Sequence, residues 1–478
     1  MRRFADEDED SEGLLELLQS IDWPTRRAGL QSLGALGAEA SEHSPSIARL
    51  LTDEESEIRK LAAVTLRKVC QRSQNSSAVQ ALMRALRDKD AMVRAEAARA
   101  LGACAPAGVA SKALSELSAD SAADVGLAAV EALVALDQPQ ALGDFVAKSS
   151  QAAVRRAALV ALGRSPLALR EHRTLVCAAV ADSDATVRVA AVQATGELGN
   201  DADDEHLAAV AALRETEKQT KIRRAAVQAL GKAGTSGVSH LLEYFCDEDE
   251  SIKHFAAETL ATVGGPEAAE AAAMLLEVFD PSVQQAAILS LGKMGACGQQ
   301  YAPDIASCLH GDTSAVRLSA IKALGELHVA STAEALGALV SDEGKGVRLA
   351  AVAALARLER EGALQVIRFF ADADQAVRAA AVKVFNPLHS KMQSGVAREF
   401  LQSIADCTRD ADWRVRFEAV KALGDLQASE WASFAASLAD DEESQVRRTA
   451  VTALEKMGEK GAALLQSFKN DTDEKVQG

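Results

Sequence analysis

Aromatic residues are scarce in this chain, which has three tryptophans, two tyrosines and an aromatic content of 4% over 478 residues. Because aromatic residues are enriched in strands, their scarcity argues against a fold built on sheets. Hydrophobic residues nevertheless make up 48% of the chain. They are mostly alanine, leucine and valine, which suit many thin contacts between helices better than one thick core.

Disulfide, zinc and membrane signals are missing as well. The seven cysteines include no CxxC pair, which predicts free thiols in a reducing, cytoplasmic compartment and no zinc site. The chain has no run of eighteen apolar residues, the length that could span a bilayer, so we expect no membrane insertion. The start, MRRFADEDEDSE, has no apolar signal-peptide core. We expect residues 1–11 to form an acidic flexible tail.

Motifs for catalysis or nucleic-acid binding are equally scarce. The formal net charge is −17, which disfavours nucleic acid as a partner because phosphate contacts need clustered lysine and arginine. The chain contains no P-loop, GxGxxG, GxSxG or HExxH motif, and none of its eight histidines is followed by glutamate. We therefore expect no catalytic residue, no metal and no cofactor.

One phrase recurs along the whole chain: an acidic turn, valine or isoleucine, then arginine, with alanine three residues and leucine seven residues after the arginine. The basic position serves as an anchor for counting, and successive anchors are 29 to 38 residues apart. The anchors are Arg26, Arg59, Arg94, Gly126, Arg155, Arg188, Arg223, Lys253, Gln284, Arg317, Arg348, Arg378, Arg416 and Arg447. A period in this range is typical of repeat architectures.

Each repeat is predicted to be a hairpin of two helices. The anchored helix has apolar residues one before and three, four and seven after the anchor, which is one face of a 3.6-residue period. The position three after the anchor is alanine in thirteen of the fourteen copies. Helices of about ten to fifteen residues are marginal alone in water, so each hairpin must stack on its neighbours. The pattern therefore predicts an all-α, α-solenoid fold over residues 12–478.

The phrase D-x-x-x-V-R-x-x-A-x-x-A-L-G resembles the HEAT repeat family, and most closely its short subclass named after phycobilin lyases. The resemblance implies a right-handed, armadillo-like superhelix of about fourteen hairpins, with second helices on the concave side. It also implies a ladder between successive repeats, from the turn aspartate to the second-helix arginine. Ladder residues would include Asp53, Asp88, Arg94, Asp182, Arg188, Asp342, Arg348, Asp372, Arg378 and Asp441. Gly126 and Ser149 depart from the pattern, so we expect a weaker ladder around residues 120–155.

Two places in the repeat array are irregular. Residues 386–399 lie in the longest gap between anchors, which predicts a bend or a longer loop, with ordinary loop variation as the alternative. The final copy is cut off at Val476–Gln477. Its preceding helix either frays or docks onto another subunit, which would make the C-terminal repeat a site of self-association.

A stripe of basic and apolar side chains would line the concave side implied by the resemblance. Residues one and five after the anchors are frequently basic or apolar, and only Glu131 and Glu258 are acidic. We hypothesise a groove for an acidic, partly apolar segment of a partner protein, formed by Arg99, Arg156, Arg224, Leu289, Leu318, Lys322, Leu349, Lys383, Phe417 and Lys421. In the alternative interpretation, the long basic side chains only cover helix surface and pair with turn acids.

The sequence thus favours a non-catalytic, cytoplasmic scaffold or adaptor that binds other proteins. The alternative function is a bilin lyase-like or chromophore-binding protein. That alternative depends on the resemblance to the phycobilin-lyase subclass, from which no catalytic residue can be transferred by motif.

Overall fold

The computed structural model describes residues 13–70, 76–389, 397–438 and 440–465, and within these ranges the regular structure is helical, without a strand. The chain forms two compact units, residues 1–241 and 242–478. The expected acidic tail and the cut-off last copy lie outside the described residues, so both stay predictions. None of the described helices combines the length and the apolar character needed to cross a bilayer.

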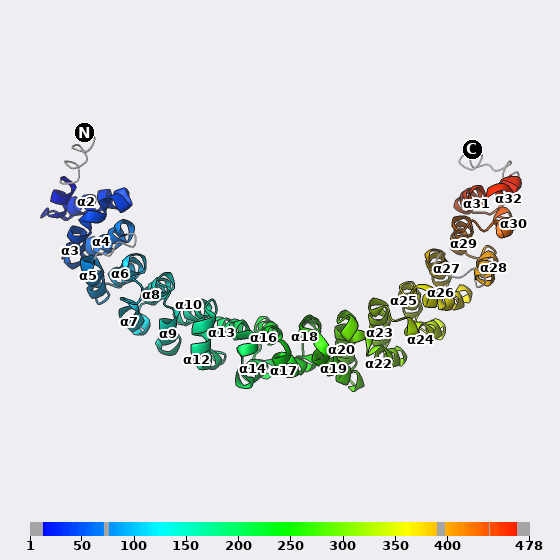
Figure 1. Cartoon of the computed structure of the whole chain (residues 1–478), viewed down its shortest axis with the longest axis horizontal. Helices are drawn as coiled ribbons and strands as arrows, with labels where there is room; N and C mark the ends of the chain where they lie inside the picture. Colours follow the sequence, from blue (N-terminus) through cyan, green and yellow to red (C-terminus); the bar gives the residue numbers. More distant parts are fainter. Residues whose placement is uncertain (1–12, 71–75, 390–396, 439, 466–478) are drawn as a thin grey trace. The chain divides into compact units, whose positions relative to one another are not determined.

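Unit 1 consists of two rows of helices, and its second helices line the concave side of the unit (Figure 1). The concave row contains α2 (Trp23–Leu36), α4 (Ser56–Val69), α6 (Ala91–Cys104), α8 (Ala123–Ala135), α10 (Ala152–Leu162), α13 (Ala185–Leu198) and α16 (Thr220–Lys232). The convex row contains residues 13–18, α3 (Ser44–Arg49), α5 (Ser76–Ala85), α7 (Ser111–Ser115), α9 (Gly143–Lys148), α11 (Pro166–Glu171), α12 (Arg173–Ala179), α14 (Asp204–Ala211) and α15 (Leu213–Thr216). Helix α17 (Val238–Glu243) contains the boundary between the units.

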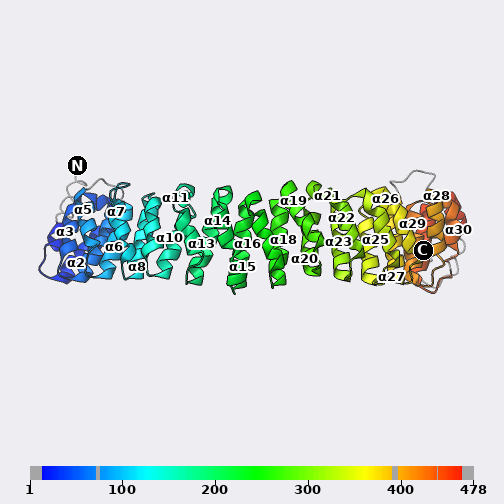
Figure 2. The same ribbon diagram turned by 90° about the horizontal axis from the view of Figure 1, so that it is seen from below.

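Unit 2 repeats this arrangement, and within each unit successive helices of a row lie side by side (Figure 2). Its second helices are α18 (Glu250–Val263), α20 (Pro281–Lys293), α23 (Ser314–Leu327), α25 (Lys345–Leu355), α27 (Gln375–His389), α29 (Trp413–Asp425) and α31 (Ser444–Lys456). The other row contains α19 (Gly265–Met274), α21 (Ala296–Gln299), α22 (Ala302–Ser307), α24 (Ala333–Ala338), α26 (Glu359–Val366), α28 (Ala397–Cys407), α30 (Ala432–Ala436) and α32 (Gly458–Leu464).

Short 3-10 helices extend or join many helices of the convex rows. In unit 1 they are η1 (Gly37–His43), η2 (Leu50–Thr52), η3 (Glu116–Ala119), η4 (Pro139–Leu142), η5 (Gly199–Asp201) and η6 (Gly234–Gly237). In unit 2 they are η7 (Tyr244–Cys246), η8 (Leu275–Glu277), η9 (Cys308–His310), η10 (Ala330–Thr332), η11 (Leu339–Ser341), η12 (Ile367–Ala371) and η13 (Ser429–Trp431). Such pieces are common where helices end, because tightening the last turn satisfies carbonyl groups that would otherwise lack donors.

Aspartate caps begin several of the second helices, and a glycine ends α13. The Asp184 carboxylate caps α13 by accepting hydrogen bonds from the backbone N–H groups of Thr186 and Val187. Asp90 and Asp280 cap α6 and α20 in the same way. An aspartate at this position satisfies N–H groups that have no partner within the helix. Gly199 ends α13 with φ 55°, a left-handed backbone conformation that glycine adopts without steric cost.

The core is a thin layer between the two rows of each unit. In α13, the residues one before and three and four after the anchor are Val187, Ala191 and Val192, and all three are fully buried. Alanine in the middle of this face lets the two helices of neighbouring hairpins approach closely. Burying a valine or leucine side chain contributes about 1.5–3 kcal/mol, and only stacked neighbours supply the surface that buries it.

Neighbouring second helices touch backbone to backbone at one repeated position, eight residues after the anchor. In α6 and α13 this position is occupied by Gly102 and Gly196. A Cβ atom added to Gly102 would lie 2.8 Å from the Cα atom of Ala132 in the next second helix, and one added to Gly196 would lie 3.0 Å from the Cα atom of Ala229. At Gly102 and Gly196, a larger residue would therefore force the two helices to shift.

The segment expected to form a loop or bend at residues 386–399 is helical at both ends. Helix α27 continues to His389 and α28 begins at Ala397. The intervening residues, 390–396, lie outside the described part of the chain, so the bend itself stays a prediction.

The close helix contact at Gly102 predicts a specific destabilisation. We expect Gly102→Val to lower the free energy of unfolding by about 1–3 kcal/mol, because the added atoms must push α6 and α8 apart. Gly346→Val is the control, because Gly346 has nothing within 4 Å of an added Cβ. Urea unfolding followed by circular dichroism measures both variants, and an unchanged midpoint for Gly102→Val would contradict the packing argument.

Candidate partner-binding groove

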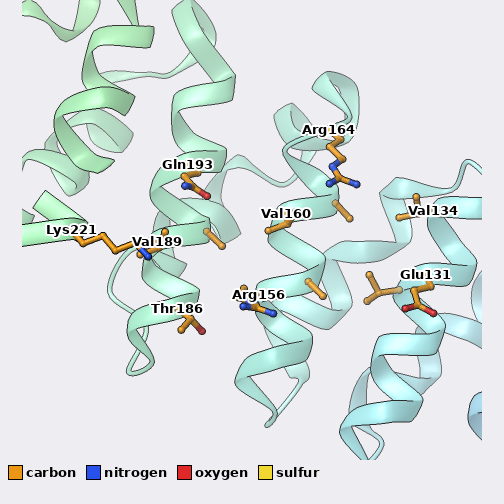
Figure 3. A pocket seen from close by; sticks show the side chains of 13 residues that line it. Glu131, Val134, Arg156, Val160, Arg164, Thr186, Val189, Gln193 and Lys221 are labelled. Atoms are coloured by element: carbon orange, nitrogen blue, oxygen red, sulfur yellow. The ribbon is translucent and has the colours of Figure 1, made fainter. Parts of the chain in front are cut away.

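A groove of about 650 Å³ opens on the concave side of unit 1, between α8, α10, α13 and the start of α16 (Figure 3). Its apolar lining comes from valines and alanines, and half of its polar lining residues are basic. The lining side chains with most bearing on binding are Val130, Glu131, Val134, Arg156, Val160, Arg164, Val189, Gln193 and Lys221.

Val134 of α8 and Val160 of α10 are exposed inside the groove. Val134 lies eight residues after the anchor Gly126, at the position that Gly102 occupies in α6 and Gly196 in α13. Val134 is 47% exposed and Val160 is 43% exposed. Two valines with this exposure, side by side, form an apolar floor open to solvent.

The charge of the groove is opposite in sign to that of the whole chain. Arg156, Arg164 and Lys221 are exposed, and no described residue forms an ion pair with any of them. The acidic residue of the groove, Glu131, already accepts a hydrogen bond from Arg99, with a distance of 3.4 Å between Arg99 Nε and Glu131 Oε2. The groove therefore offers three cations without a counter-ion on an apolar floor.

Two adjoining grooves lie on the second helices of unit 2, and the charge of the first is more balanced. The first, of about 300 Å³, lies between α18, α20 and α23, and its Lys293 is 2.8 Å from Glu258. The second, of about 350 Å³, lies between α23 and α25 and includes Leu318 and Arg357. Lys322 lines both. Nowhere in the described chain do three or more metal-ligating side chains gather closely enough to hold a metal ion.

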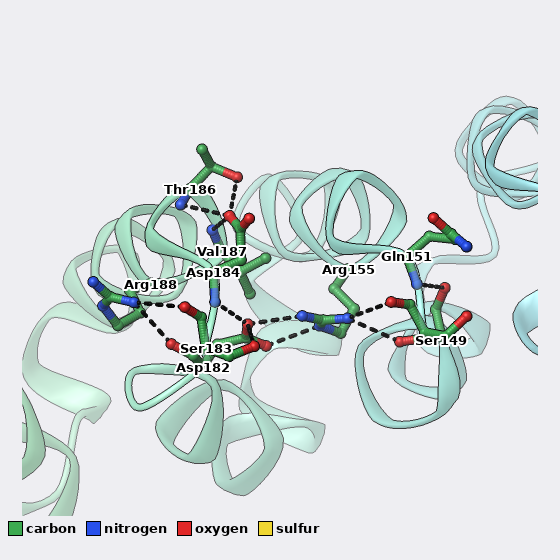
Figure 4. A network of polar contacts seen from close by, with 10 residues as sticks. Ser149, Gln151, Arg155, Asp182, Ser183, Asp184, Thr186, Val187 and Arg188 are labelled. Carbon is green, nitrogen blue, oxygen red and sulfur yellow. Dashed lines mark hydrogen bonds and ion pairs between the residues drawn. The ribbon is translucent and has the colours of Figure 1, made fainter.

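A ladder of arginine–carboxylate pairs joins neighbouring repeats at the turns between first and second helices (Figure 4). Arg155 donates from Nε and Nη2 to the two carboxylate oxygens of Asp182 in the next repeat, at 2.8 and 2.7 Å. Its Nη1 donates to the carbonyl groups of Ser149 and Ser150 in its own turn, at 3.1 and 3.2 Å. One guanidinium therefore fixes two turns at once.

The carboxylate of each such pair also shapes its own turn. Asp182 Oδ1 accepts a hydrogen bond from the backbone N–H of Asp184 at 2.8 Å. The next anchor, Arg188, then donates from Nη1 to the carbonyl oxygens of Asp182 and Ser183. We call one such arginine–carboxylate pair a rung. Because Asp184 caps α13, the rung at Asp182 fixes the turn in which α13 starts.

The same rung recurs in both units, and its acid always lies six residues before the next anchor. In unit 1 the pairs are Arg26–Asp53, Arg59–Asp88, Arg94–Asp120, Arg155–Asp182 and Arg188–Glu217. In unit 2 they are Arg317–Asp342, Arg348–Asp372, Arg378–Asp410 and Arg416–Asp441. Bidentate arginine–carboxylate contacts of this kind combine charge with fixed geometry.

The rungs at Arg155 and Arg59 change the pKa of their members. The hydrogen bond from Arg155 lowers the pKa of Asp182 below its ordinary value, although burial acts in the opposite direction. The same hydrogen bond raises the pKa of Arg155. For Asp88, burial alone would raise the pKa, but the hydrogen bonds from Arg59 and from the N–H of Asp90 outweigh it, so the pKa is lowered.

Both members of a rung are missing together between α8 and α10. Gly126 supplies no guanidinium and Ser149 supplies no carboxylate. The side-chain amide of Gln151 instead donates to the Ser121 carbonyl at 3.3 Å, and the Gln151 N–H donates to Ser149 Oγ, also at 3.3 Å. These are longer and uncharged contacts. The groove of unit 1 borders this joint and also the next one, between α10 and α13, which the Arg155–Asp182 rung bridges.

A second interruption lies in unit 2, between α18 and α23. Val278 and Gly311 stand where the acids of two rungs would be. Lys253 Nζ contacts Ser282 Oγ at 2.6 Å, and Gln284 Nε2 donates to the Leu276 carbonyl at 3.0 Å. The joints that miss these rungs also border a groove, the one between α18, α20 and α23.

A family model of HEAT repeats matches residues 11–102, 47–134, 208–292, 302–386 and 401–478, which together cover more than half of the chain. The chain belongs to the HEAT-repeat family. The predicted all-α solenoid of HEAT repeats is therefore confirmed, and the fourteen anchors lie on fourteen second helices. The matching model describes HEAT repeats in general, so the phycobilin-lyase subclass and the bilin alternative stay predictions.

Solved structures with a similar fold include Kap121p, with 11% sequence identity and a TM-score of 0.52 over 96% of this chain and 58% of that chain. Kap121p bound to Nup53p gives 12% identity and a TM-score of 0.52 over 96% of this chain and 66% of that chain. A Kap121p mutant gives 11% identity and a TM-score of 0.51 over 93% and 56% of the two chains. The chain thus spans little more than half of the first of these, and identities this low show the fold alone. No curated protein matches the sequence.

The residues predicted for partner binding lie on second helices of the HEAT repeats, in both units. Arg156 lines the groove of unit 1, and Leu289, Leu318 and Lys322 line the grooves of unit 2. Arg99 pairs with Glu96 and Glu131. The remaining predicted residues lie outside the lining of these grooves, namely Arg224, Leu349, Lys383, Phe417 and Lys421. A role in binding stays a prediction for all ten.

Several residues of the groove and ladder were missed from the sequence. Val134 and Arg164 lie eight and nine residues after their anchors, one helical turn beyond the positions that we considered. The rung acids Asp120, Glu217 and Asp410 were also missed. A search at the sixth position before each anchor would have found all three.

The ladder geometry predicts unequal effects for two aspartates. We expect Asp182→Asn to lower the free energy of unfolding by about 1–2 kcal/mol, because a hydrogen bond to a charged group becomes a weaker neutral one. Asp201→Asn is the control, because the Asp201–Arg170 pair is roughly half exposed and should contribute less than about 1 kcal/mol. Urea unfolding of both variants measures the difference, and equal shifts would contradict a structural role for the rung.

The lowered aspartate pKa values predict an acid-sensitive solenoid. Each such rung contributes its full stabilisation above the ordinary aspartate pKa of about 3.9, and loses it as the pH falls through the lower folded-state value. We therefore expect the urea midpoint to be nearly constant from about pH 7 to about pH 5 and to fall steeply below about pH 4. Asp182→Asn should reduce the size of that fall, and an identical pH profile would argue against the rung as its source.

Proposed function

We propose that this HEAT-repeat protein is a non-catalytic scaffold or adaptor whose concave side binds an acidic, partly apolar segment of a partner protein. The observation that carries the proposal is the combination, on the second helices, of exposed valine or leucine with cations that have no ion-pair partner in the described chain. Arg156 with Val160 in unit 1, and Lys322 with Leu318 in unit 2, are the clearest examples.

Physical chemistry supports a protein segment as the occupant. Exposed aliphatic surface gains free energy when a partner covers it. Unpaired cations on a chain of net charge −17 select an acidic segment through charge complementarity. A fold of this kind is compatible with the role, because Kap121p, which has a similar fold, has been solved with Nup53p bound.

The proposal predicts that charge reversal on unit 2 abolishes partner binding. The variant carries Lys322→Glu, Lys383→Glu and Lys421→Glu, all exposed on second helices. A partner recovered with the wild-type chain by affinity purification should be lost from pull-downs with this variant, at a reduction of at least about tenfold. Far-ultraviolet circular dichroism should be unchanged, because none of the three side chains is buried.

The matched control reverses three exposed cations on the other row of unit 2, with Arg360→Glu, Arg368→Glu and Lys460→Glu. It changes the net charge by the same amount and should leave the pull-down intact. Unchanged binding by the first variant, or equal loss in both, would overturn the proposal that the second helices of this unit form the binding surface.

A further inference from the structure

Helix α10 and the turn that follows it present basic, apolar and basic side chains to the unit 1 groove. Arg156 and Val160 lie on α10, and Arg164 lies in the turn two residues after the last helical residue, Leu162 (Figure 3). Because Gly163 keeps helical dihedral angles, a rise of 1.5 Å per residue places the two arginines about 12 Å apart along the axis direction, with the valine between them. The groove therefore has two cationic ends and an apolar centre.

The neighbouring helices complete this arrangement. Val134 of α8 and Val189 of α13 lie on either side of Val160, and Lys221 extends from α16 toward Val189 (Figure 3). Arg156, Arg164 and Lys221 are all exposed, and none has an ion-pair partner in the described residues. The only acid that lines the groove is Glu131, which Arg99 already contacts.

This spacing matches an extended peptide that runs along α10. An extended chain advances about 3.3 Å per residue, so about 12 Å corresponds to four steps. Alternate side chains point to the same face, so the first, third and fifth residues would face the groove together. Carboxylates at the first and fifth positions would pair with the two arginines, and an aliphatic side chain at the third would cover the valines.

We propose, on the basis of the function proposed above, that this groove is the site for an extended partner segment with the pattern acidic–any–aliphatic–any–acidic. The Arg156 and Arg164 guanidinium groups bind the two carboxylates, Val134, Val160 and Val189 bind the aliphatic side chain, and Lys221 attracts further acidic residues that flank the segment.

Charge distinguishes this groove from the one between α18, α20 and α23, and its aliphatic floor favours a peptide over nucleic acid. The groove between α18, α20 and α23 has its Lys293 neutralised by Glu258 and also contains Glu326. In the unit 1 groove the floor is aliphatic, whereas single-stranded nucleic acid requires aromatic side chains for base stacking. The missing rung between α8 and α10 also lets these helices shift around a bound segment at a lower cost than at a joint that a carboxylate bridges.

The test uses the full chain and a synthetic, fluorescein-labelled peptide with glutamate, leucine and glutamate at alternate positions in a serine–glycine background. Fluorescence anisotropy should show saturable binding. Arg156→Glu combined with Arg164→Glu should weaken it at least about tenfold. Lys112→Glu combined with Arg173→Glu is the control, because these exposed cations lie on the convex row of the same unit, and it should leave the affinity unchanged.

Peptide variants test the register. Moving one glutamate to the adjacent position should weaken binding, because that side chain then points away from the groove. A peptide with lysines in place of the glutamates should bind the Arg156→Glu, Arg164→Glu variant better than the wild-type chain. This recovery cannot arise from misfolding, since a misfolded groove would bind neither peptide.

Three outcomes would overturn the inference: no saturable binding of the peptide, equal binding by wild type and the arginine variant, or displacement of the peptide by a single-stranded oligonucleotide at a lower concentration than by unlabelled peptide. If the peptide test fails while the pull-down still depends on Lys322, Lys383 and Lys421, this groove is not the binding site, but the proposed scaffold function still holds. Failure of both experiments would remove the scaffold function as well.

Discussion

The arrangement of neighbouring repeats depends on one interaction, the rung between an arginine on a second helix and a carboxylate in the next turn. In the rung at Arg155, a single guanidinium holds Asp182 of the following repeat and two carbonyl groups of its own turn. The carboxylate in turn accepts the N–H of Asp184, which caps the next second helix. The rung thus sets the spacing and register of hairpins that are too short to be stable alone.

Joints without a rung border two of the three grooves, the one between α8, α10 and α13 and the one between α18, α20 and α23. The third groove lies between α23 and α25, at a joint that the Arg317–Asp342 rung bridges. Between α8 and α10, the arginine, the carboxylate and the packing glycine are all replaced, by Gly126, Ser149 and Val134. The first two replacements remove the rung, and Val134 adds an exposed side chain to the groove. Many acids of the chain lie in turns and caps, and no acid of the described residues forms an ion pair with the cations of this groove, although the chain as a whole is acidic.

Much of the fold follows from the sequence because the repeat signal is local and recurs fourteen times. The alanine three residues after the anchor and the aspartate at the helix cap can each be recognised within a single repeat of the sequence. The groove was harder to predict, since its lining comes from four helices in four repeats. Val134 stands out only when it is compared with Gly102 and Gly196, which contact the next helix. Glu217 was missed as a rung acid because it is not an aspartate. The interruptions of the ladder at Val278 and Gly311 were missed because the absence of a carboxylate produces no sequence motif.

Hydrogen exchange of backbone amides, resolved by mass spectrometry on the intact chain, tests the role of the rung most directly. After correction for intrinsic rates, the account predicts slow exchange at Asp184, where a rung carboxylate accepts the N–H at 2.8 Å. It predicts faster exchange at Gln151, where only the Ser149 hydroxyl accepts at 3.3 Å and the rung is missing. Equal protection of these two turns would contradict the claim that the rung holds the repeats in register.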